Sequence, residues 1–511
     1  MAKKVRVRFA PSPTGGLHLG GVRTVLYNYL FAKQHGGDFV LRIEDTDQSR
    51  YVEGAEQYIF DCLKWCGLFP DESPVSGGPY APYRQSERKE IYRKYAEQLV
   101  KQGNAYYAFD TVAELEEMRE KFKTETNPQP QYNYLLRNQM RNSLTLGEDE
   151  VRRFMSEGMP YVVRIKMPDE ENVSFTDMIR GHVSFSSSTV DDKVLLKADG
   201  MPTYHLAVVV DDYLMKITHA FRGEEWLPSA PVHVLLWKYL GWEHEMPQWA
   251  HLPLILKPDG HGKLSKRDGD RLGFPVFTMD WLDPKTGEVT TGFKEKGFLP
   301  EAFINMLAML GWNDGTGQEI FTIEELVRSF SMDRVHKGGA KFDYEKAKWF
   351  NHEWIKKLPV NHWMATVKAD FEEKGVVIDD EEQFKQVLQL VRERCMLLTD
   401  FWQQSSFFFK APADLDLASI KPKWNEQKKE FFHDLQDALL NLHPFDSVTI
   451  EAFFKDLAGR KNIKAGDLQL PFRIMLVGGK FGPPVFDIAA TIGLEQTKSR
   501  INKALQDLTR G

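Results

Sequence analysis

Two short segments carry residues whose types and spacing could handle a nucleoside triphosphate. Residues 11–21 read Pro-Ser-Pro-Thr-Gly-Gly-Leu-His-Leu-Gly-Gly, and residues 263–267 read Lys-Leu-Ser-Lys-Arg. Glycines let the backbone approach a phosphate closely, and a helix that starts behind them favours negative charge. His18 could donate a hydrogen bond or carry charge beside the phosphates. Lys263 and Lys266 could close over the triphosphate and stabilise the departing pyrophosphate.

Each segment by itself is a weak signal. A histidine followed by glycines is more often a cap in a loop, and a lysine-rich loop is usually only a solvated surface. The two segments occur together, in this order and with a predicted α/β region between them. This combination favours the interpretation that they bind a nucleoside triphosphate. Activation of a carboxylate by ATP needs positioning and charge neutralisation more than acid–base catalysis, because the carboxylate is already a nucleophile.

The elements around the first segment predict a doubly wound nucleotide-binding fold. Residues 5–9 alternate like a strand, residues 22–33 carry apolar side chains at helical spacing, and residues 38–43 read as a second strand. Strand, glycine-rich loop, helix and strand is the opening of such a fold. Further helices are expected at 53–66 and 86–102, and buried strands at 207–210 and 252–256.

Residues 104–200 differ in character and predict an insertion that splits the α/β domain. Thr111 and Glu114 have the spacing of a capping box, and residues 161–167 and 182–189 are β-like. From about residue 300 onward helical patterns dominate, and the last third of the chain reads as all-helical. Helices are expected at 300–312, from the capped Thr322 onward, and at 424–442.

Bulk properties exclude several classes of protein. The chain has 511 residues, too many for one hydrophobic core, and no apolar run long enough to cross a bilayer. Residues 1–8 alternate charged and apolar residues, unlike a signal peptide. Three cysteines provide no disulfide framework and indicate a reducing compartment, so we expect the cytoplasm. A net charge of −7 argues against a uniformly basic nucleic-acid binder, but basic residues can gather on one face.

The chain resembles the glutamyl-tRNA synthetases of bacteria and organelles. The two segments look like the two ATP-handling signatures of class I aminoacyl-tRNA synthetases, the HIGH and KMSKS motifs, and Arg42-Ile43-Glu44-Asp45-Thr46-Asp47 resembles the text of the glutamate family. The resemblance extends over nearly the whole chain. It implies ATP-dependent ligation of L-glutamate to the 3′-terminal adenosine of tRNA(Glu) through a glutamyl adenylate, with Mg²⁺ accompanying ATP and no covalent enzyme intermediate.

The resemblance also implies a domain order. The expected architecture is α/β, with a Rossmann-like doubly wound catalytic domain split by an α+β insertion and followed by helical stem-contact and all-α anticodon-binding domains. The expected boundaries are 1–103 and 201–262 for the two catalytic halves, 104–200 for the acceptor-binding insertion, 263–345 for the stem-contact domain with the Lys-Leu-Ser-Lys-Arg loop, and 346–511 for the anticodon-binding domain. A monomer is the family expectation.

The resemblance assigns substrate-binding residues in three groups. The catalytic group is His18, Lys263 and Lys266. ATP is expected at His18, Gly20, Glu225, Leu254, Ile255 and Lys266. Glutamate is expected among Arg8, Ser12, Glu44, Tyr204, Arg222 and Trp226, with Arg8 and Arg222 on its side-chain carboxylate and Glu44 on its ammonium group. Taken singly, each of these could be an ordinary ion pair or core aromatic. A metal site at Glu44, Asp45 and Asp47 is disfavoured because no histidine joins them.

Three C-terminal residues resemble anticodon contacts. Arg394 looks like the residue that reads the third anticodon base and rejects tRNA for glutamine. Arg473 and Pro483 resemble further contacts, since unstacked bases suit arginine forks and apolar turns. A helical arginine is nevertheless usually a surface residue.

The chain departs from its relatives in two places. Some relatives carry a zinc knuckle in the insertion, where this chain has Tyr106-Tyr107-Ala108-Phe109 and no cysteine. Cys62 and Cys66 fall on a predicted helix and read as core residues, so no structural zinc and no other metal site is expected. Residues 273–292 form an extra stretch that predicts a hairpin-like excursion.

Four alternatives remain open. Glutaminyl-tRNA synthetases share the fold, but they carry C-terminal β-barrels where this chain reads as helical. A truncated relative that modifies a tRNA base would lack the anticodon region, and a small nucleotidyltransferase would not account for the length. An inactive, RNA-binding paralogue would be expected to lose His18 or Lys266, and both are present.

Overall fold

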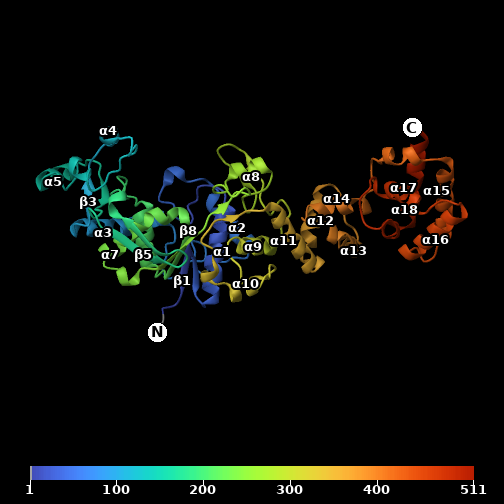
Figure 1. The fold of residues 1–511 in the computed structure, drawn as a ribbon, viewed down its shortest axis with the longest axis horizontal. Helices are drawn as coiled ribbons and strands as arrows, with labels where there is room; N and C mark the ends of the chain where they lie inside the picture. The colour runs from blue at the N-terminus through green and yellow to red at the C-terminus, as the bar shows by residue number, and fades with distance from the viewer. Residues whose placement is uncertain (1–2, 511) are drawn as a thin grey trace. The chain divides into compact units, whose positions relative to one another are not determined.

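The chain folds into two compact units. The computed structural model describes residues 3–510, so Met1 and Ala2 of the alternating N-terminal stretch lie outside it. The first unit contains residues 1–295 and 303–344, and the second contains 296–302 and 345–511. Figure 1 shows the first unit in blue to yellow and the second mainly in orange to red. No helix among residues 3–510 is both long and apolar enough to cross a membrane.

A mostly parallel sheet forms the centre of the first unit. Its strands are β1 (Arg6–Phe9), β2 (Asp38–Leu41), β5 (Asn172–Asp177), β6 (Gly181–Ser186), β8 (His219–Gly223) and β9 (Gln248–Leu252). β1 pairs with β2 in parallel, and β9 lies in parallel between β5 and β8. β6 is antiparallel to β5, and the amide of Thr218 donates to the carbonyl of Arg6 at 2.9 Å, which brings β8 beside β1. The predicted opening of a doubly wound fold is therefore confirmed.

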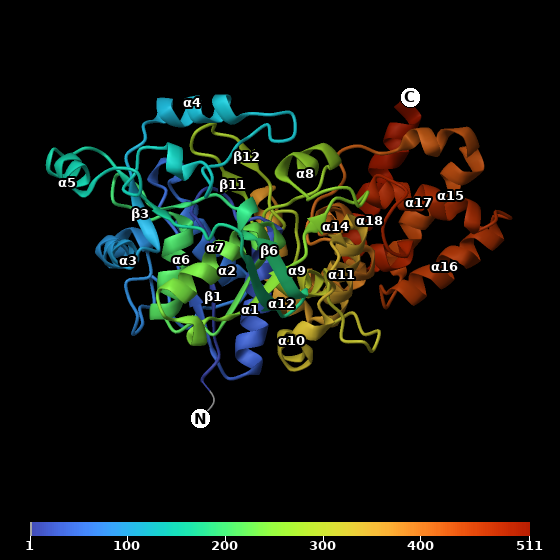
Figure 2. The ribbon, with the colours of Figure 1, turned by 60° about the vertical axis from the view of Figure 1, so that its left-hand side comes forward.

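Helices cover this sheet and carry the loops that follow its strands. They are α1 (Leu19–Gln34), α2 (Ala55–Trp65), α3 (Lys89–Lys101), α6 (Tyr204–Leu214) and α7 (Ala230–Tyr239). Figure 2 shows α6 and α7 packed beside each other, and α7 also contacts β5. The prediction of a buried strand at 207–210 is wrong, because these residues form the middle of α6. A short run of valines cannot by itself distinguish a buried helix from a buried strand.

The region 104–200 contains a small antiparallel sheet of its own. Its strands are β3 (Ala105–Ala108), β4 (Val162–Ile165) and β7 (Val194–Leu196), and its helices are α4 (Val112–Phe122) and α5 (Glu148–Ser156). The predicted capping box of Thr111 and Glu114 is confirmed at the start of α4. β5 and β6 also fall within this stretch of sequence, yet they pair with the central sheet.

A buried carboxylate organises the core of the region 104–200. The hydroxyl of Tyr106 donates to Asp192 Oδ2 at 2.6 Å, Arg137 Nη1 lies 3.3 Å from the same oxygen, and the amide of Met167 donates to Oδ1 at 3.1 Å. Burial raises the pKa of Asp192 to about 6, although these donors oppose the shift. Two hydrogen bonds and one ion pair thus join Asp192 to three other segments of this core.

The rest of the first unit positions the second lysine-rich segment. It contains β10 (Ile255–Leu256) paired with β13 (Ala340–Lys341), α8 (Lys266–Leu272), β11 (Trp281–Leu282) antiparallel to β12 (Val289–Thr290), and α10 (Ile323–Ser329), while α9 (Pro300–Met309) begins in the second unit. The hairpin expected within 273–292 is confirmed as β11–β12. Its base is fixed by Tyr58, whose hydroxyl donates to the carbonyl of Met279 and accepts from its amide.

The second unit is all-helical, as predicted. Its helices are α11 (Tyr344–Lys357), α12 (Val360–Glu373), α13 (Glu381–Val391), α14 (Asp400–Ser405), α15 (Glu426–Ala438), α16 (Ser447–Arg460), α17 (Gly466–Val477) and α18 (Val485–Arg510). α18 bends at Gly493, whose φ of 81° is not helical. Phe431, Phe454, Phe472 and Phe486 pack together in the core of the C-terminal helices.

Candidate active site

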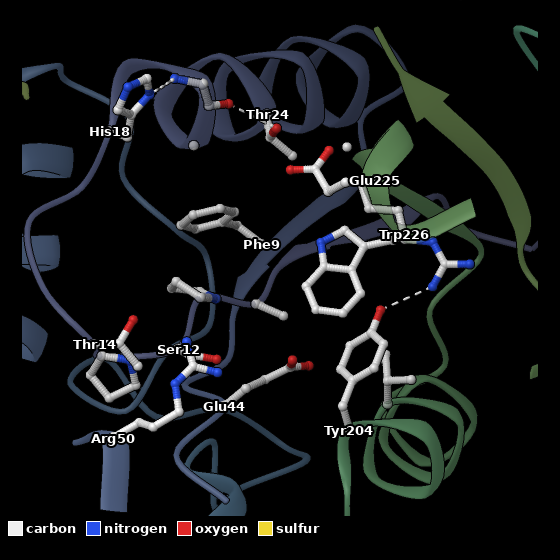
Figure 3. A pocket seen from close by; sticks show the side chains of 18 of the residues that line it. Phe9, Ser12, Thr14, His18, Thr24, Glu44, Arg50, Tyr204, Glu225 and Trp226 are labelled. Atoms are coloured by element: carbon white, nitrogen blue, oxygen red, sulfur yellow. Dashed lines mark hydrogen bonds between the residues drawn. The ribbon is translucent and has the colours of Figure 1, made fainter. Parts of the chain in front are cut away.

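One large cavity gathers residues from distant parts of the sequence. It has a volume of about 930 Å³ and lies in the first unit, at the carboxyl ends of β1 and β8 and at the start of α1. Figure 3 shows side chains that converge on it from these elements. The predicted residues that line it are Arg8, Ser12, His18, Gly20, Glu44, Tyr204, Arg222, Glu225, Trp226, Leu254, Ile255 and Lys263. Lys266 instead lines a neighbouring cavity of about 400 Å³.

His18 uses its two ring nitrogens differently. It is the residue before α1, and its Nδ1 accepts a hydrogen bond from the amide of Gly20 at 3.3 Å. Nε2 must then carry the proton in the neutral ring, and this atom is buried without a partner among residues 3–510. Burial, with a smaller contribution from Lys263, lowers the pKa of His18 to about 4. His18 is therefore a neutral donor near pH 7, which removes the expectation that it could carry charge.

A buried network of arginines and carboxylates forms one side of the cavity. Arg8 donates from Nε and Nη2 to the two oxygens of Asp212, both at 3.2 Å. Arg42 donates to Asp212 at 2.9 Å and to Glu44 at 3.0 Å. Burial raises the pKa of Glu44, although Arg42 and Arg8 act in the opposite direction. The charge of Arg8 is thus largely neutralised by Asp212, a residue of α6 that the sequence did not single out.

Arg222 has different partners. Its Nε donates to His251 Nε2 at 2.9 Å, and its Nη1 contacts the hydroxyl of Tyr204 and His233 Nδ1, each at 3.0 Å. The bond to Tyr204 is drawn in Figure 3. Nη2 is buried and has no partner among residues 3–510. The guanidinium therefore keeps two N–H groups for a ligand that enters the cavity.

Aromatic rings border the same end of the cavity. The rings of Tyr204 and Trp226 lie 4.5 Å apart at a tilt of 39°, and Trp226 remains 41% exposed. Figure 3 shows both rings opposite Glu44 and Ser12. A small acidic ligand held by Arg222 would be in contact with these rings.

Carboxylates already neutralise both lysines of the second segment. Lys263 Nζ lies 2.6 Å from Glu225 Oε1, and Lys266 Nζ lies 3.3 Å from Glu288 Oε2 on the β11–β12 hairpin. Ser265 and Asp268 form a capping box that fixes the start of α8 at Lys266. Because all four charged side chains are substantially exposed, phosphate oxygens could replace the carboxylates at low cost.

Hydrogen bonds within the chain fix the backbone at the other end of the cavity. The amide of Leu254 donates to Glu224 Oε1 at 2.9 Å, and the amide of Leu264 donates to the carbonyl of Ile255 at 2.9 Å. These contacts tie the segment before the lysine-rich loop to the end of β8. Leu254 and Ile255 thus present apolar side chains and backbone beside Glu225.

The carboxylates after β2 make hydrogen bonds within the chain. Asp45 accepts from the amide and hydroxyl of Ser86 at 2.8 and 2.5 Å, and exposed Asp47 accepts from Ser49. Among residues 3–510 no three histidine, cysteine or carboxylate side chains are placed to hold a metal ion. Cys62 and Cys66 are buried at α2, and burial raises the pKa of both thiols.

In the second unit, the three predicted anticodon residues differ in exposure. Arg394 is exposed and makes no hydrogen bond or ion pair with the part of the chain that the structure describes. Arg473 Nη1 donates to the carbonyls of Phe481, Gly482 and Pro483 at 3.2, 3.2 and 2.5 Å. Burial and the nearby charge of Arg394 lower the pKa of Arg473. Arg473 thus holds the turn that contains buried Pro483, while Arg394 is free for a ligand.

Sequence reasoning missed four residues behind the cavity. They are Asp177, Asp212, His233 and His251, all buried and all bound directly or through one residue to a predicted arginine. Isolated histidines and aspartates in apolar segments of a sequence are ordinarily core or cap residues. Only the pairing of β5, β8 and β9 brings Asp177 and His251 to Arg222.

Comparison with known proteins agrees with this geometry. Residues 4–349 match the family of tRNA synthetases class I (E and Q), catalytic domain, and residues 346–505 match an anticodon binding domain family. Glutamate–tRNA ligase of Amoebophilus asiaticus is 51% identical over 506 residues, 99% of both chains. That of Cytophaga hutchinsonii is 50% identical over 508 residues, 99% of this chain and 98% of the relative.

A solved structure is equally similar. A glutamate tRNA ligase from Elizabethkingia meningosepticum in complex with its amino acid superposes with a TM-score of 0.94 at 49% identity, covering 99% of this chain and all of that one. The fold, the two ATP-handling segments and the helical second unit are thus those of one family. The chain belongs to the class I tRNA synthetases, within the glutamate–tRNA ligases.

Proposed function

We propose that this protein joins L-glutamate to the 3′-terminal adenosine of tRNA(Glu) with ATP and Mg²⁺, releasing AMP and pyrophosphate. The α-carboxylate of glutamate attacks the α-phosphorus of ATP and forms glutamyl adenylate. A ribose hydroxyl of the terminal adenosine then attacks the acyl carbonyl. The convergence of both ATP-handling segments and the predicted acidic-ligand residues on one cavity carries this proposal.

The glutamate end of the cavity is the end that contains Arg222. Its two unpartnered N–H groups supply a fork for the side-chain carboxylate. Glu44 supplies a carboxylate for the ammonium group, with Tyr204, Trp226 and Ser12 around the chain of the amino acid. Arg8, which is paired with Asp212, adds a weaker positive potential than the sequence suggested.

The ATP end contains His18, Gly20, Glu225, Leu254 and Ile255. The neutral Nε2–H of His18 donates to a phosphate oxygen, where a positioned donor stabilises developing charge. Lys263 and Lys266 exchange their carboxylate partners for the triphosphate, and Mg²⁺ enters with ATP. No structural zinc is included in this proposal.

tRNA is proposed to contact both units. The region 104–200 receives the acceptor end, residues 263–345 contact the stem, and residues 346–511 bind the anticodon. Exposed Arg394 reads the third anticodon base, whereas Arg473 contributes by holding the turn at Pro483. We further propose a monomer in the cytoplasm.

Charging of purified tRNA with labelled glutamate and ATP tests the function. We expect glutamylation of tRNA(Glu) and its loss in Lys266→Ala, with an exposed-lysine variant such as Lys94→Ala as the matched control. Charging of tRNA(Glu) alone supports Arg394 as the discriminating residue, and charging of tRNA(Gln) as well contradicts that role only. A folded enzyme that charges neither tRNA would refute the proposed function.

A further inference from the structure

Arg222 is held by an unusual set of hydrogen-bond acceptors. An arginine offers five N–H donors. His251 takes the one on Nε, and Tyr204 and His233 take the two on Nη1, all at 2.9 or 3.0 Å. The two on Nη2 have no acceptor among residues 3–510. None of the acceptors is a carboxylate, and Arg222 forms no ion pair within the described chain.

The N–H group on Nε of Arg222 determines which ring nitrogen of His251 carries the proton. Because Nε of arginine can only donate, His251 Nε2 must accept and His251 Nδ1 must carry the proton. That proton is directed to Asp177 Oδ2 at 2.6 Å. The other oxygen of Asp177 accepts from the amides of Ile179 and Arg180, each at 2.9 Å. Asp177 is thereby fixed, and it holds the imidazole of His251 in one tautomer and orientation.

The tautomer of His233, which lies on α7, is determined in the same way. Its Nδ1 accepts from Arg222, so its Nε2 carries the proton and lies 3.3 Å from His205 Nδ1. Burial, strengthened by the charge of Arg222, lowers the pKa of His233 well below its usual value. Burial likewise lowers the pKa of His251, although Asp177 opposes this shift. Both histidines are neutral near pH 7.

Arg222 therefore differs from the other arginines of this cavity. Arg8 and Arg42 contact Asp212 directly, and Arg42 also contacts Glu44. No carboxylate contacts Arg222 directly, because Asp177 is connected to it only through the ring of His251. The positive charge of Arg222 is therefore not compensated in the way that the charge of Arg8 is. A buried guanidinium whose donors are partly unused favours an anionic ligand over a neutral isostere, because only the anion compensates its charge.

We propose that His251 and His233 are positioning residues that set the selectivity of this site for an anionic side chain. As neutral acceptors they orient Arg222 with Nη2 free and leave its charge uncancelled until glutamate binds. This inference rests on the proposed function, in which the side-chain carboxylate of glutamate contacts Arg222.

The test replaces each histidine in two ways and measures steady-state glutamylation of tRNA(Glu). His251→Leu removes the acceptor, whereas His251→Gln retains a neutral acceptor of similar reach. We expect the first to raise KM for glutamate about ten- to hundredfold, the scale of a lost hydrogen bond to a charged group. KM for ATP should stay within about twofold. The second should stay within about threefold of the wild type.

Selectivity provides the readout that a purely structural role would not change. The Ki of glutamine as a competitor, divided by KM for glutamate, should fall at least tenfold in His251→Leu and be restored in His251→Gln. His219→Gln is the matched control, because His219 lies on β8 with Arg222 but its side chain is hydrogen-bonded, among residues 3–510, only to its neighbour Thr218; it should leave the ratio unchanged. If the buried His251 variants do not fold, His233→Leu and His233→Gln decide by the same comparison.

The outcomes separate this inference from the proposed function. A wild-type enzyme that glutamylates tRNA(Glu), with leucine variants that keep their KM for glutamate and their selectivity, overturns the inference alone. Equal losses in the leucine and glutamine variants, or a parallel rise in KM for ATP, also overturn it, because they indicate general damage. A wild-type enzyme that forms no glutamyl-tRNA overturns the proposed function first.

Discussion

The two nitrogens of His18 predict that stability and catalysis can be separated at one residue. His18→Ala removes both the acceptor that caps α1 and the Nε2 donor. His18→Asn retains a side-chain oxygen that can cap the helix, but its short amide cannot also reach the position of Nε2. We therefore expect the alanine variant to lose both properties and the asparagine variant to lose only catalysis.

The magnitudes follow from the two contacts. The bond from Gly20 to His18 Nδ1 is long at 3.3 Å, so loss of the cap should cost about 0.5–1 kcal/mol of unfolding free energy. Loss of one positioned donor to the reacting phosphate should lower kcat about 10²- to 10³-fold. With a pKa of about 4, His18 is only about 1% protonated at pH 6, so it should impose no change in kcat between pH 6 and 8.

Urea unfolding and glutamylation at saturating substrates measure the two effects. The stability that neutral His18 contributes is present above pH 6.5 and decreases as the pH falls towards 4, because the unfolded chain binds the proton more readily. An asparagine variant as unstable as the alanine variant would contradict the capping role. An asparagine variant with more than a tenth of wild-type kcat would contradict the donor role.

Three further predictions concern other charged groups. In a direct binding titration, Glu288→Gln should lower the Kd for ATP by up to about fivefold, the limit for an exposed ion pair, and should have no effect on this Kd when combined with Lys266→Ala. Arg473→Met should lower the free energy of unfolding in urea by about 2 kcal/mol, because three carbonyls lose a donor. Arg394→Ala should change this free energy by less than about 0.5 kcal/mol and should instead relax selection against tRNA(Gln). Because the pKa of Asp192 is raised to about 6, the free energy of unfolding of the wild type should fall as the pH rises from about 4 to 6. Asp192→Asn should abolish this pH dependence. An unchanged pH profile in the variant would contradict the prediction.

Local signals in the sequence predicted much of the fold. The capping boxes at Thr111 and Thr322 lie where they were expected, because this motif depends on residues only three positions apart. The helix after the glycine-rich loop and the hairpin after the second segment were likewise predicted from local patterns. Such features need no knowledge of the tertiary structure.

The failure at 207–210 has a tertiary cause. Valine favours strands, but a helix here places Asp211 and Asp212 against the buried arginines Arg8 of β1 and Arg42, which directly follows β2. Leaving these buried arginines without carboxylate partners would cost about 3–5 kcal/mol, which is more than the small difference between helix and strand propensity. β5 was not predicted for a related reason, because its short segment of alternating polar and apolar residues becomes a strand of the central sheet only beside β9.

The sequence reasoning did not foresee how the charges of the cavity are paired. Family resemblance placed twelve residues that line one cavity, yet it gave Arg8 and Arg222 the same role. Their difference depends on partners from other elements, Asp212 on α6 and the histidines on α7 and β9. No spacing in the sequence reports such contacts.

The hairpin base has a consequence for how this sequence can evolve. A Cβ at Gly16 would lie 3.0 Å from Cγ of Trp281 and 3.3 Å from Cδ1 of Phe277, so even alanine would push these rings by a few tenths of an ångström. A side chain at residue 16 therefore requires the rings of Trp281 and Phe277 to shift. Two segments more than 260 residues apart in the sequence therefore constrain each other.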